Sequence, residues 1–255
     1  MYRHFAHVYD SFMKIAPYDK WAVYIDKVFK NNGVPYGSLV LDLACGTGTM
    51  AFLMAQKGYE IIGVDASEDM LSEAAQKKEI MVKGKDILFL NQDILNLDLY
   101  GTVNAAYSTC DALNYILTEE ELEKVLFNVA LFLETKGVFI FDLKTEARYR
   151  QMGSNTYYDN VNNKQSGEEA SYIWKNHFDP ITKINEYNVQ FFLGGKKRES
   201  EIFSEVHRQR AYDVDFVKHI TQKAGFLVEV VDNYTDNYAR ADSDRVTFIC
   251  IKSPL

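Results

Sequence analysis

Cysteine is scarce in this sequence, and the spacing of the few cysteines narrows the possibilities. Cys45, Cys110 and Cys250 are an odd number without close pairing, and no CxxC or CxxH spacing can form a thiolate metal site. We therefore expect no metal site and a reducing environment. The first residues, Met1 to Phe5, combine aromatics and charges where a signal peptide needs an apolar stretch, which favours a cytoplasmic protein.

Positive charge and long apolar runs are also in short supply. The 28 Lys and Arg residues are outnumbered by 36 Asp and Glu residues, so the formal net charge is -8. Such a charge repels phosphate backbones and anionic membranes, and it disfavours a nucleic-acid partner. No apolar run approaches the length that spans a membrane, so we expect no membrane partner either.

The remaining composition is that of an ordinary folded protein. The chain has 255 residues, of which 47% are hydrophobic and 25% charged, and it has no internal repeat. This length suits one large domain, or one domain with a sizeable insertion.

Apolar segments that end at or near an acid alternate with amphipathic segments over roughly the first half of the chain. The segments predict strands and helices in turn: strands at 39–43, 60–65, 87–90, 103–107 and 138–142, and helices at 50–57, 67–80 and 118–133. This alternation predicts a parallel sheet with helices on both faces. Ligands of such sheets bind beyond the carboxyl ends of the strands, where five acids are expected: Asp42, Asp65, Asp93, Asp111 and Asp142.

The periodicity changes near Arg148. Alternation with a period of two residues predicts antiparallel strands, with a turn at Asp179-Pro180 and a two-residue loop at Gly194-Gly195: the strands lie within 172–178, 187–193 and 198–208. A helix at 212–224 and two antiparallel strands at 226–231 and 245–251 follow. We therefore predict an α/β, Rossmann-like fold with a seven-stranded, mostly parallel sheet whose last strand is antiparallel. Residues 1–147 and 211–255 would form this domain, and residues 148–210 a small antiparallel β-rich insertion.

The segment from Leu39 to Gly48 indicates a cofactor site. Gly46 and Gly48 allow a ligand to lie against the backbone. Asp65, seventeen residues further on, can accept both hydroxyls of a ribose. Asp93 at the end of the third strand can accept a hydrogen bond from an exocyclic amine such as that of adenine.

The acid before the glycine loop limits the kind of cofactor. Asp42 would repel a pyrophosphate, whereas it would attract an ammonium or a sulfonium group. The sequence therefore predicts a cofactor with an adenosine and a cation, and without phosphates.

Several motifs together give the chain a family resemblance. These motifs are Asp42 to Gly48, Val64 to Ser67, Gln92 to Ile94, and the segment 108–115 after the fourth strand. In these positions the sequence resembles the class I S-adenosylmethionine-dependent methyltransferases. It is similar to small-molecule methyltransferases with a β-rich insertion, such as glycine N-methyltransferase and the amino-sugar N-methyltransferases. Two further features resemble that branch: an N-terminal lid with Tyr9, Tyr18 and Trp21, and a His-x-x-Arg-x-Tyr pattern at 207–212.

The resemblance implies S-adenosylmethionine as the cofactor. Asp42 and the backbone of Ala44 and Gly46 would serve the methionine amino group, and Asp65 would take the ribose hydroxyls. Met70 and Ile94 would enclose the adenine. The implied cofactor-binding residues are Tyr9, Tyr18, Trp21, Asp42, Ala44, Cys45, Gly46, Thr47, Gly48, Asp65, Ala66, Met70, Gln92, Asp93, Ile94, Thr109 and Cys110.

Three ionisable residues are candidates for catalysis, and each has a structural alternative. His207 would be a general base or a substrate ligand, or else a structural histidine of the insertion. Asp111 would hold a substrate amine or cap a helix. Tyr9 would touch the transferring methyl group or only seal the site.

We therefore expect methyl transfer by direct displacement to a small molecule that carries an amine or a hydroxyl. A non-catalytic protein that binds S-adenosylmethionine is the first alternative. Methylation of RNA or protein is the second, although the basic clusters at 196–198 and 208–210 are flanked by acids. An oxidoreductase that uses NAD is the third. The sequence does not determine the acceptor, the methylated atom or the oligomeric state.

Overall fold

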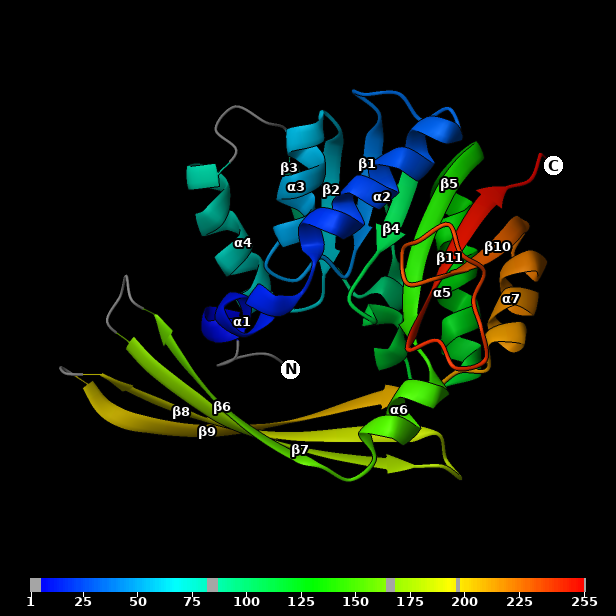
Figure 1. The fold of residues 1–255 in the computed structure, drawn as a ribbon. Helices are drawn as coiled ribbons and strands as arrows, with labels where there is room; N and C mark the ends of the chain where they lie inside the picture. The colour runs from blue at the N-terminus through cyan, green and yellow to red at the C-terminus, as the bar shows by residue number, and fades with distance from the viewer. Residues whose placement is uncertain (1–5, 82–86, 164–167, 196–197, 255) are drawn as a thin grey trace.

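The computed structural model describes residues 6–81, 87–163, 168–195 and 198–254, and it contains two separate sheets (Figure 1). The larger sheet has seven strands in the order β10-β11-β5-β4-β1-β2-β3. Strand β11 is antiparallel to both of its neighbours, and the other pairs are parallel. This confirms the predicted sheet. Its strands are β1 (Leu39–Leu43), β2 (Glu60–Asp65), β3 (Ile87–Asn91), β4 (Val103–Ser108), β5 (Leu133–Lys144), β10 (Phe226–Asp232) and β11 (Arg245–Lys252).

Helices cover both faces of this sheet, as the near-continuous apolar strands require. Thr118 caps α5 by accepting the N–H of Glu121, and Gly58 ends α3 with a φ of 109°. The helical segments are α1 (Ala6–Phe12), η1 (Met13–Ile15), α2 (Tyr18–Asn31), α3 (Thr49–Lys57), α4 (Glu68–Met81), η2 (Ile94–Asn96), η3 (Ala112–Tyr115), α5 (Glu119–Phe132), α6 (Glu146–Met152) and α7 (Val214–Lys223). None of the described helices is long and apolar enough to cross a membrane.

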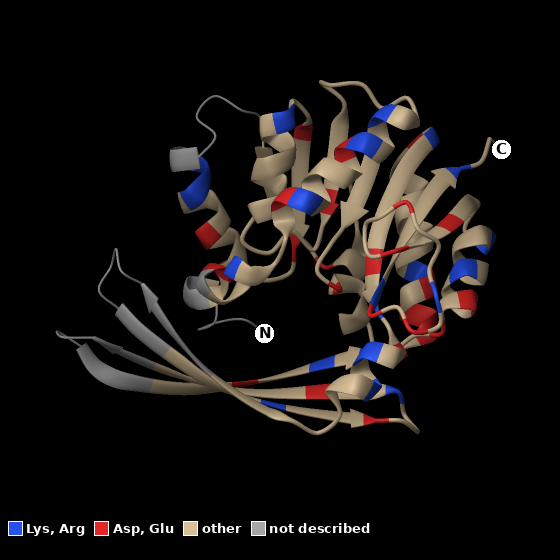
Figure 2. Cartoon of the chain, viewed as in Figure 1, with Lys and Arg blue, Asp and Glu red and all other residues tan. Residues whose placement is uncertain are grey.

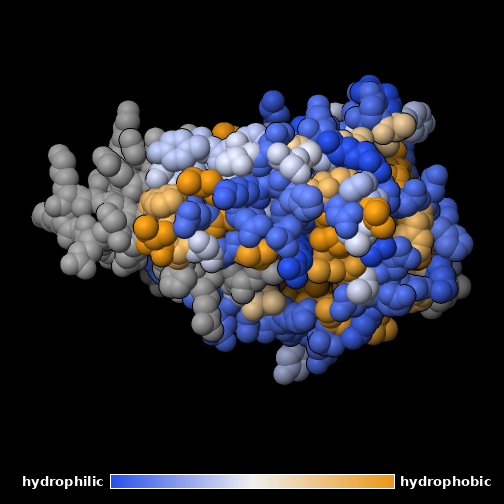
Figure 3. All heavy atoms as spheres, turned by 90° about the horizontal axis from the view of Figure 1, so that it is seen from below, coloured by the Kyte–Doolittle hydropathy of each residue, from blue (hydrophilic) through white to orange (hydrophobic). Residues whose placement is uncertain are grey.

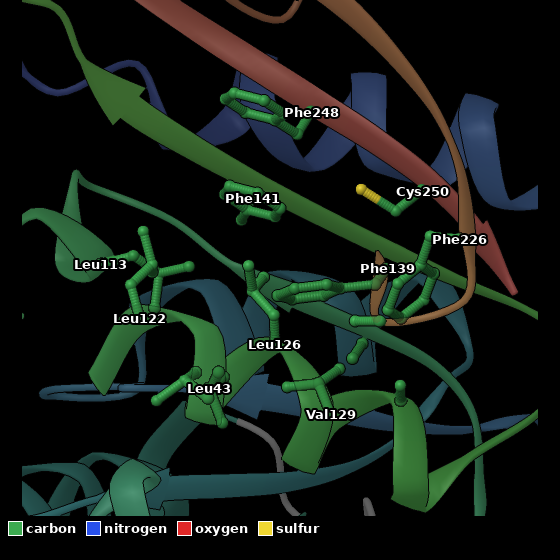
Figure 4. Packing of buried hydrophobic residues seen from close by; sticks show 14 of the residues in the cluster. Leu43, Leu113, Leu122, Leu126, Val129, Phe139, Phe141, Phe226, Phe248 and Cys250 are labelled. Carbon is green, nitrogen blue, oxygen red and sulfur yellow. The ribbon is translucent and has the colours of Figure 1, made fainter. Parts of the chain in front are cut away.

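Each face of the large sheet has its own apolar core. On one face, α5 and α7 pack against strands β5, β10 and β11, and Figure 4 shows the rings of this core beside leucines of α5. Phe141 and Phe248 stack in parallel, with ring centroids 4.6 Å apart. On the other face, α2 and α3 cover residues such as Val40 and Ile140. Burial on both faces makes this sheet a rigid support for the strand ends.

The smaller sheet is antiparallel and has four strands in the order β6-β7-β8-β9. They are β6 (Thr156–Asn163), β7 (Glu168–Asp179), β8 (Ile184–Gly195) and β9 (Arg198–Arg210). The sequence indicated three of these strands. It did not indicate β6, because this segment is rich in Asn and Asp and lacks clear alternation.

The connection between β8 and β9 differs from the expected one. Gly194 and Gly195 pair with Glu169 and Glu168 of β7, so the prediction of a loop at these two glycines was wrong. The pairing between β7 and β8 therefore continues through both glycines. Residues 196–197, which follow them, lie outside the described part of the chain. The turn at Asp179 is confirmed, since its carboxylate accepts the N–H of Ile181 at 2.8 Å.

The four-stranded sheet lies opposite the carboxyl ends of the parallel strands, and helix α1 lies between the two sheets (Figure 1). Figure 2 shows acidic positions at the strand ends that face the four-stranded sheet. Seen from the side of that sheet, hydrophobic residues form separate patches among hydrophilic ones (Figure 3). The arrangement places the predicted cofactor residues at the strand ends that face the four-stranded sheet (Figure 1).

Candidate active site

The glycine loop between β1 and α3 is tightly packed on one side and open on the other. Ala44, Gly46 and Gly48 have positive φ angles of 61°, 54° and 77°. A Cβ at Gly48 would lie 2.9 Å from a ring carbon of Phe89, whereas no described residue has an atom within 4 Å of the Cβ position at Gly46. The loop can therefore receive a ligand against its backbone at Gly46.

Cys45 lies within this loop and is buried. Burial, followed by the charges of Asp42 and Asp65, raises the pKa of its thiol. A thiol that stays protonated is a poor nucleophile, so Cys45 serves the loop as a small buried residue.

Asp42 lies at the end of β1 and is almost fully buried. The Tyr107 hydroxyl donates to its Oδ2 at 3.0 Å, and the backbone N–H of Ala51 in the first turn of α3 also donates to it. Burial, with a smaller effect from the charge of Asp65, raises the pKa of Asp42 to about 8. The carboxyl group therefore holds a proton at neutral pH, and a cation placed near it would favour the charged form.

Asp65 ends β2 and fastens the glycine loop. Its Oδ2 accepts the N–H of Gly46 at 2.8 Å, and its Oδ1 accepts the N–H of Ser67 at 2.9 Å. Burial raises the pKa of Asp65, and these N–H groups oppose the shift. A carboxylate offers more acceptor positions than these bonds use, so Asp65 can also accept ribose hydroxyls.

The predicted adenine contacts gather at the ends of β2 and β3. Asp65 and Asn91 are partners in this parallel pair, which brings the segments that follow them side by side. Ala66 is exposed, Met70 is buried in α4, and Ile94 is half-buried at the start of η2. One wall of this region is therefore apolar.

The polar residues of this region are held by the backbone. The amide of Gln92 donates to the carbonyl of Asp98 at 2.9 Å and accepts its N–H at 3.1 Å. Asp93 caps η2 by accepting the N–H of Leu95 at 2.9 Å. No hydrogen bond from the described residues reaches the second carboxylate oxygen of Asp93, so this oxygen can accept one from a ligand.

Strand β4 ends in a strained turn. Cys110 and Asp111 have φ angles of 61° and 52°, a conformation that costs a non-glycine residue about 1 to 2 kcal/mol. The N–H of Asp111 donates to Asp142 at 3.0 Å, which holds the turn. Thr109, just before it, is buried. Consecutive strained residues are typical of functional sites, and this turn lies at the edge where ligands of such sheets bind.

The thiol of Cys110 faces the lid. It donates to the hydroxyl oxygen of Tyr18 at 3.4 Å, and burial raises its pKa to about 12. The thiol therefore stays protonated, which leaves the backbone of this turn as the group that can meet a cofactor.

Asp111 lies in a buried ionic network. Lys144 Nζ is 3.0 Å from its Oδ2, Arg245 is 2.5 Å from its Oδ1, and Gln209 Nε2 donates to it at 2.7 Å. Asp142 also pairs with Arg245, so two carboxylates face two cations. Burial alone would raise the pKa of Asp111, but the charges of Lys144 and Arg245 hold it at about 2. A carboxylate with this pKa is a weak base.

Three residues of this network were not predicted from the sequence: Lys144, Arg245 and Gln209. Lys144 follows Asp142 by two residues and so lies on the same face of β5, and Arg245 is its partner in β11. Gln209 reaches the network from β9, on the other sheet. Only the spacing of Asp142 and Lys144 could have been recognised, because the other contacts depend on the tertiary fold.

The predicted lid residues Tyr9, Tyr18 and Trp21 come together beside the turn after β4. Burial and then the neighbouring Tyr18, Cys110 and further groups raise the pKa of Tyr9, which also shares a hydrogen bond with Tyr18. Tyr18 and Trp21 meet edge to face with ring centroids 5.5 Å apart. Arg245 lies over the Trp21 ring at 5.4 Å, so the lid also contacts the ionic network.

His207 lies on the inner face of the four-stranded sheet. It is the partner of Tyr187 in β8 and is 2% exposed. Its ring meets Tyr115 of η3 edge to face at 6.0 Å, and its Nε2 is 3.1 Å from Oε2 of Glu205. Because Gln209 follows on the same face of β9 and reaches Asp111, His207 faces the space beyond β4.

These residues fit S-adenosylmethionine. The backbone is open at Gly46, and Asp65 has acceptor positions that its two backbone hydrogen bonds do not use. A neighbouring cation would lower the raised pKa of Asp42 and favour its charged form. No group of three or more described His, Cys, Asp or Glu residues is arranged to hold a metal ion.

Comparison with known proteins agrees with this geometry. Residues 40–137 match a family model described as a methyltransferase domain. The chain is 33% identical over 258 residues to YqeM from Bacillus subtilis, a protein named as a methyltransferase, and the match covers 99% of this chain and 98% of YqeM. The chain belongs to the class I S-adenosylmethionine-dependent methyltransferases. It is an enzyme, and S-adenosylmethionine is its cofactor.

Solved structures show the same fold in both sheets. An S-adenosylmethionine-dependent methyltransferase from Clostridium acetobutylicum matches with a TM-score of 0.85 and 28% identity, over 99% of both chains. The sugar N-methyltransferase KedS8 from Streptoalloteichus matches with a TM-score of 0.79 over 97% of this chain and 93% of its own, at 18% identity. The second match concerns the fold alone.

Proposed function

We propose that this methyltransferase acts on a small molecule with an amine or hydroxyl group, held between the lid and the inner face of the four-stranded sheet. The aromatic and polar side chains on this inner face support the proposal most strongly. Tyr187 and Trp174 meet on it with ring centroids 4.9 Å apart, and Glu205 and His207 follow on β9. Aromatic walls with a few polar groups are typical of small-molecule sites.

The cofactor supplies a methyl group made electrophilic by a positively charged sulfur. In our proposal Asp42 and the backbone of Ala44 and Gly46 hold its amino group, and Asp65 holds the ribose hydroxyls. The remaining cofactor contacts are those predicted from the sequence. The enzyme then gains most of its rate by positioning the acceptor and excluding water, so it needs no nucleophile of its own.

His207 is our candidate for the group that removes a proton from the acceptor. An amine must be neutral before it attacks, and a histidine is suited to accept a proton near neutral pH. Glu205, 3.1 Å from His207 Nε2, would stabilise the charged imidazolium. Tyr9 would orient the acceptor as a hydrogen-bond donor, because its raised pKa keeps the phenol protonated.

Asp111 is better suited to support the site than to act as a base. Its pKa of about 2 keeps it charged, and Lys144 and Arg245 already hold it. We propose that it fixes the turn after β4 against the four-stranded sheet. A direct contact with a substrate amine would require another partner to give way.

The surface charge supports a small acceptor over RNA or protein. Arg208 pairs with Glu186 at 2.9 Å, and Arg210 pairs with Glu119 at 2.8 Å. The cluster at 208–210 is thus neutralised, whereas phosphate recognition needs unpaired cations. Residues 196–197 of the other cluster lie outside the described part of the chain.

The proposal is tested by screening a metabolite library for release of S-adenosylhomocysteine. We expect turnover with one class of amines or hydroxyl compounds and none with RNA or protein mixtures. Cofactor binding by calorimetry without turnover on any acceptor would instead support a non-catalytic role. Turnover on RNA or protein alone would overturn the small-molecule acceptor.

A further inference from the structure

Asp10 extends from the lid helix α1 toward the cofactor side of the molecule. The hydroxyl of Thr47 in the glycine loop donates to its Oδ1 at 2.6 Å, and that of Thr49 lies 3.5 Å from the same oxygen. Lys77 Nζ, from α4, is 2.6 Å from Oδ2. One carboxylate of the lid is thus held by the loop and by a helix that build the cofactor site.

Other residues of α1 face the acceptor side. The Phe12 ring meets Tyr172 edge to face at 4.7 Å and lies 5.5 Å from Phe191, both in the four-stranded sheet. Figure 1 shows this short helix between the two sheets. Helix α1 therefore joins the cofactor side to the acceptor side, with an ionic contact at one and an aromatic contact at the other.

We infer that Asp10, together with Thr47 and Lys77, is a positioning residue that latches α1 closed over the cofactor. A helix of seven residues is too short to be stable alone, so its position depends on its contacts. The Asp10 side chain is 45% exposed, and an ion pair at such a site is weak enough to open and close repeatedly. S-adenosylmethionine would enter, and its product would leave, when this latch opens.

A latch that slows both the entry and the exit of the ligand can be recognised from the two rate constants. Breaking it increases the fraction of open molecules with and without ligand, so the rates of entry and exit rise together while the dissociation constant changes little. A direct contact between Asp10 and the ligand would instead increase the rate of exit alone. The two rate constants therefore distinguish a latch from a ligand contact.

The test uses Asp10→Asn and Lys77→Met, with Asp19→Asn as a matched control. Asp19 is an exposed acid in the first turn of α2, and its change removes the same charge near the lid. S-adenosylhomocysteine binding would be followed by stopped-flow fluorescence of Trp21 and Trp174. We expect both rate constants to rise about three- to fivefold in each variant, the size expected for a partly exposed ion pair, with the dissociation constant unchanged within twofold.

The double variant Asp10→Asn with Lys77→Met should raise the rates by less than the product of the two single effects, because both changes break the same ion pair. Rates equal to those of Asp19→Asn would overturn the inference. A faster exit with a proportionally weaker dissociation constant would also overturn it, by showing that Asp10 holds the ligand itself. Lys77→Met decides the question if Asp10→Asn fails to fold.

Discussion

The cofactor side of this enzyme and its proposed acceptor side, formed by the turn after β4 and the inner face of the four-stranded sheet, are built in different ways. On the cofactor side, Asp42 and Gly48 are close in the sequence, and backbone N–H groups hold Asp65. On the acceptor side, Asp111 is held by Lys144, by Arg245 and by a residue of the other sheet. The first site is a local motif, and the second is a junction of distant segments.

This difference has an energetic consequence. Backbone N–H groups stay in place when one side chain changes, so the cofactor side should tolerate substitution with a local loss of affinity. Paired charges in a buried network leave an unpaired charge behind when one is removed, so the acceptor side should lose stability. Substitutions should therefore distinguish the two sides, because one side loses cofactor affinity and the other loses stability.

The largest effect is expected for Arg245→Met. Among the described residues it leaves Asp142 without a cation and Asp111 with one cation, Lys144, so the free energy of unfolding should fall by about 3 kcal/mol. Urea unfolding measures this change. The control is Arg240→Met, which changes an exposed residue between β10 and β11 and should leave the free energy of unfolding unchanged.

A second change would test the reason for that loss. Adding Asp142→Asn to Arg245→Met removes the unpaired charge and should recover part of the stability.

The low pKa of Asp111 gives an independent check, because the folded value of about 2 lies below the unfolded value of about 3.9. Its contribution is present above about pH 4 and is lost as the pH falls toward 2. If the free energy of unfolding falls with pH in the same way in wild type and in Arg245→Met, Arg245 does not lower the pKa of Asp111.

The next largest effect is expected for His207→Gln, on turnover. Removing a general base lowers the rate by about 100-fold or more, while cofactor affinity stays the same because the residue lies on the other sheet. Steady-state release of S-adenosylhomocysteine with the acceptor from the library screen measures the rate. An unaltered rate would confine His207 and its Glu205 partner to a structural role.

These two sides also differ in how far the sequence could predict them. The alternation of strands and helices, the reversed β11 and the open Gly46 follow from local rules of alternation and of backbone conformation, and all were anticipated. The Asp111 network was not, because Gln209 and Arg245 have no periodic or motif relation to Asp111 in the sequence. Two adjacent positive φ angles at residues that are not glycine were equally invisible, since tertiary contacts impose them.

A moderate effect is expected for Asp65→Ala, on cofactor binding. The change removes the proposed ribose acceptor and frees the N–H groups of Gly46 and Ser67, so affinity for S-adenosylmethionine should fall by about 2 kcal/mol. Calorimetry measures the affinity, and a thermal melt should show that the protein remains folded. Glu68→Ala, an exposed neighbour in α4, serves as the control. Equal affinity in the two variants would remove Asp65 from the ribose site.

The smallest effect concerns the pH dependence of cofactor affinity. Burial raises the pKa of Asp42 to about 8 in the free protein, and a bound cation would lower it. Binding should therefore release a proton, and affinity should rise about tenfold between pH 6.5 and 8 and level off above that. Calorimetry in buffers of different ionisation enthalpy measures the released proton. Asp42→Asn should bind more weakly and lose this release; if the release persists in that variant, another group carries the proton and the cation does not lie against Asp42.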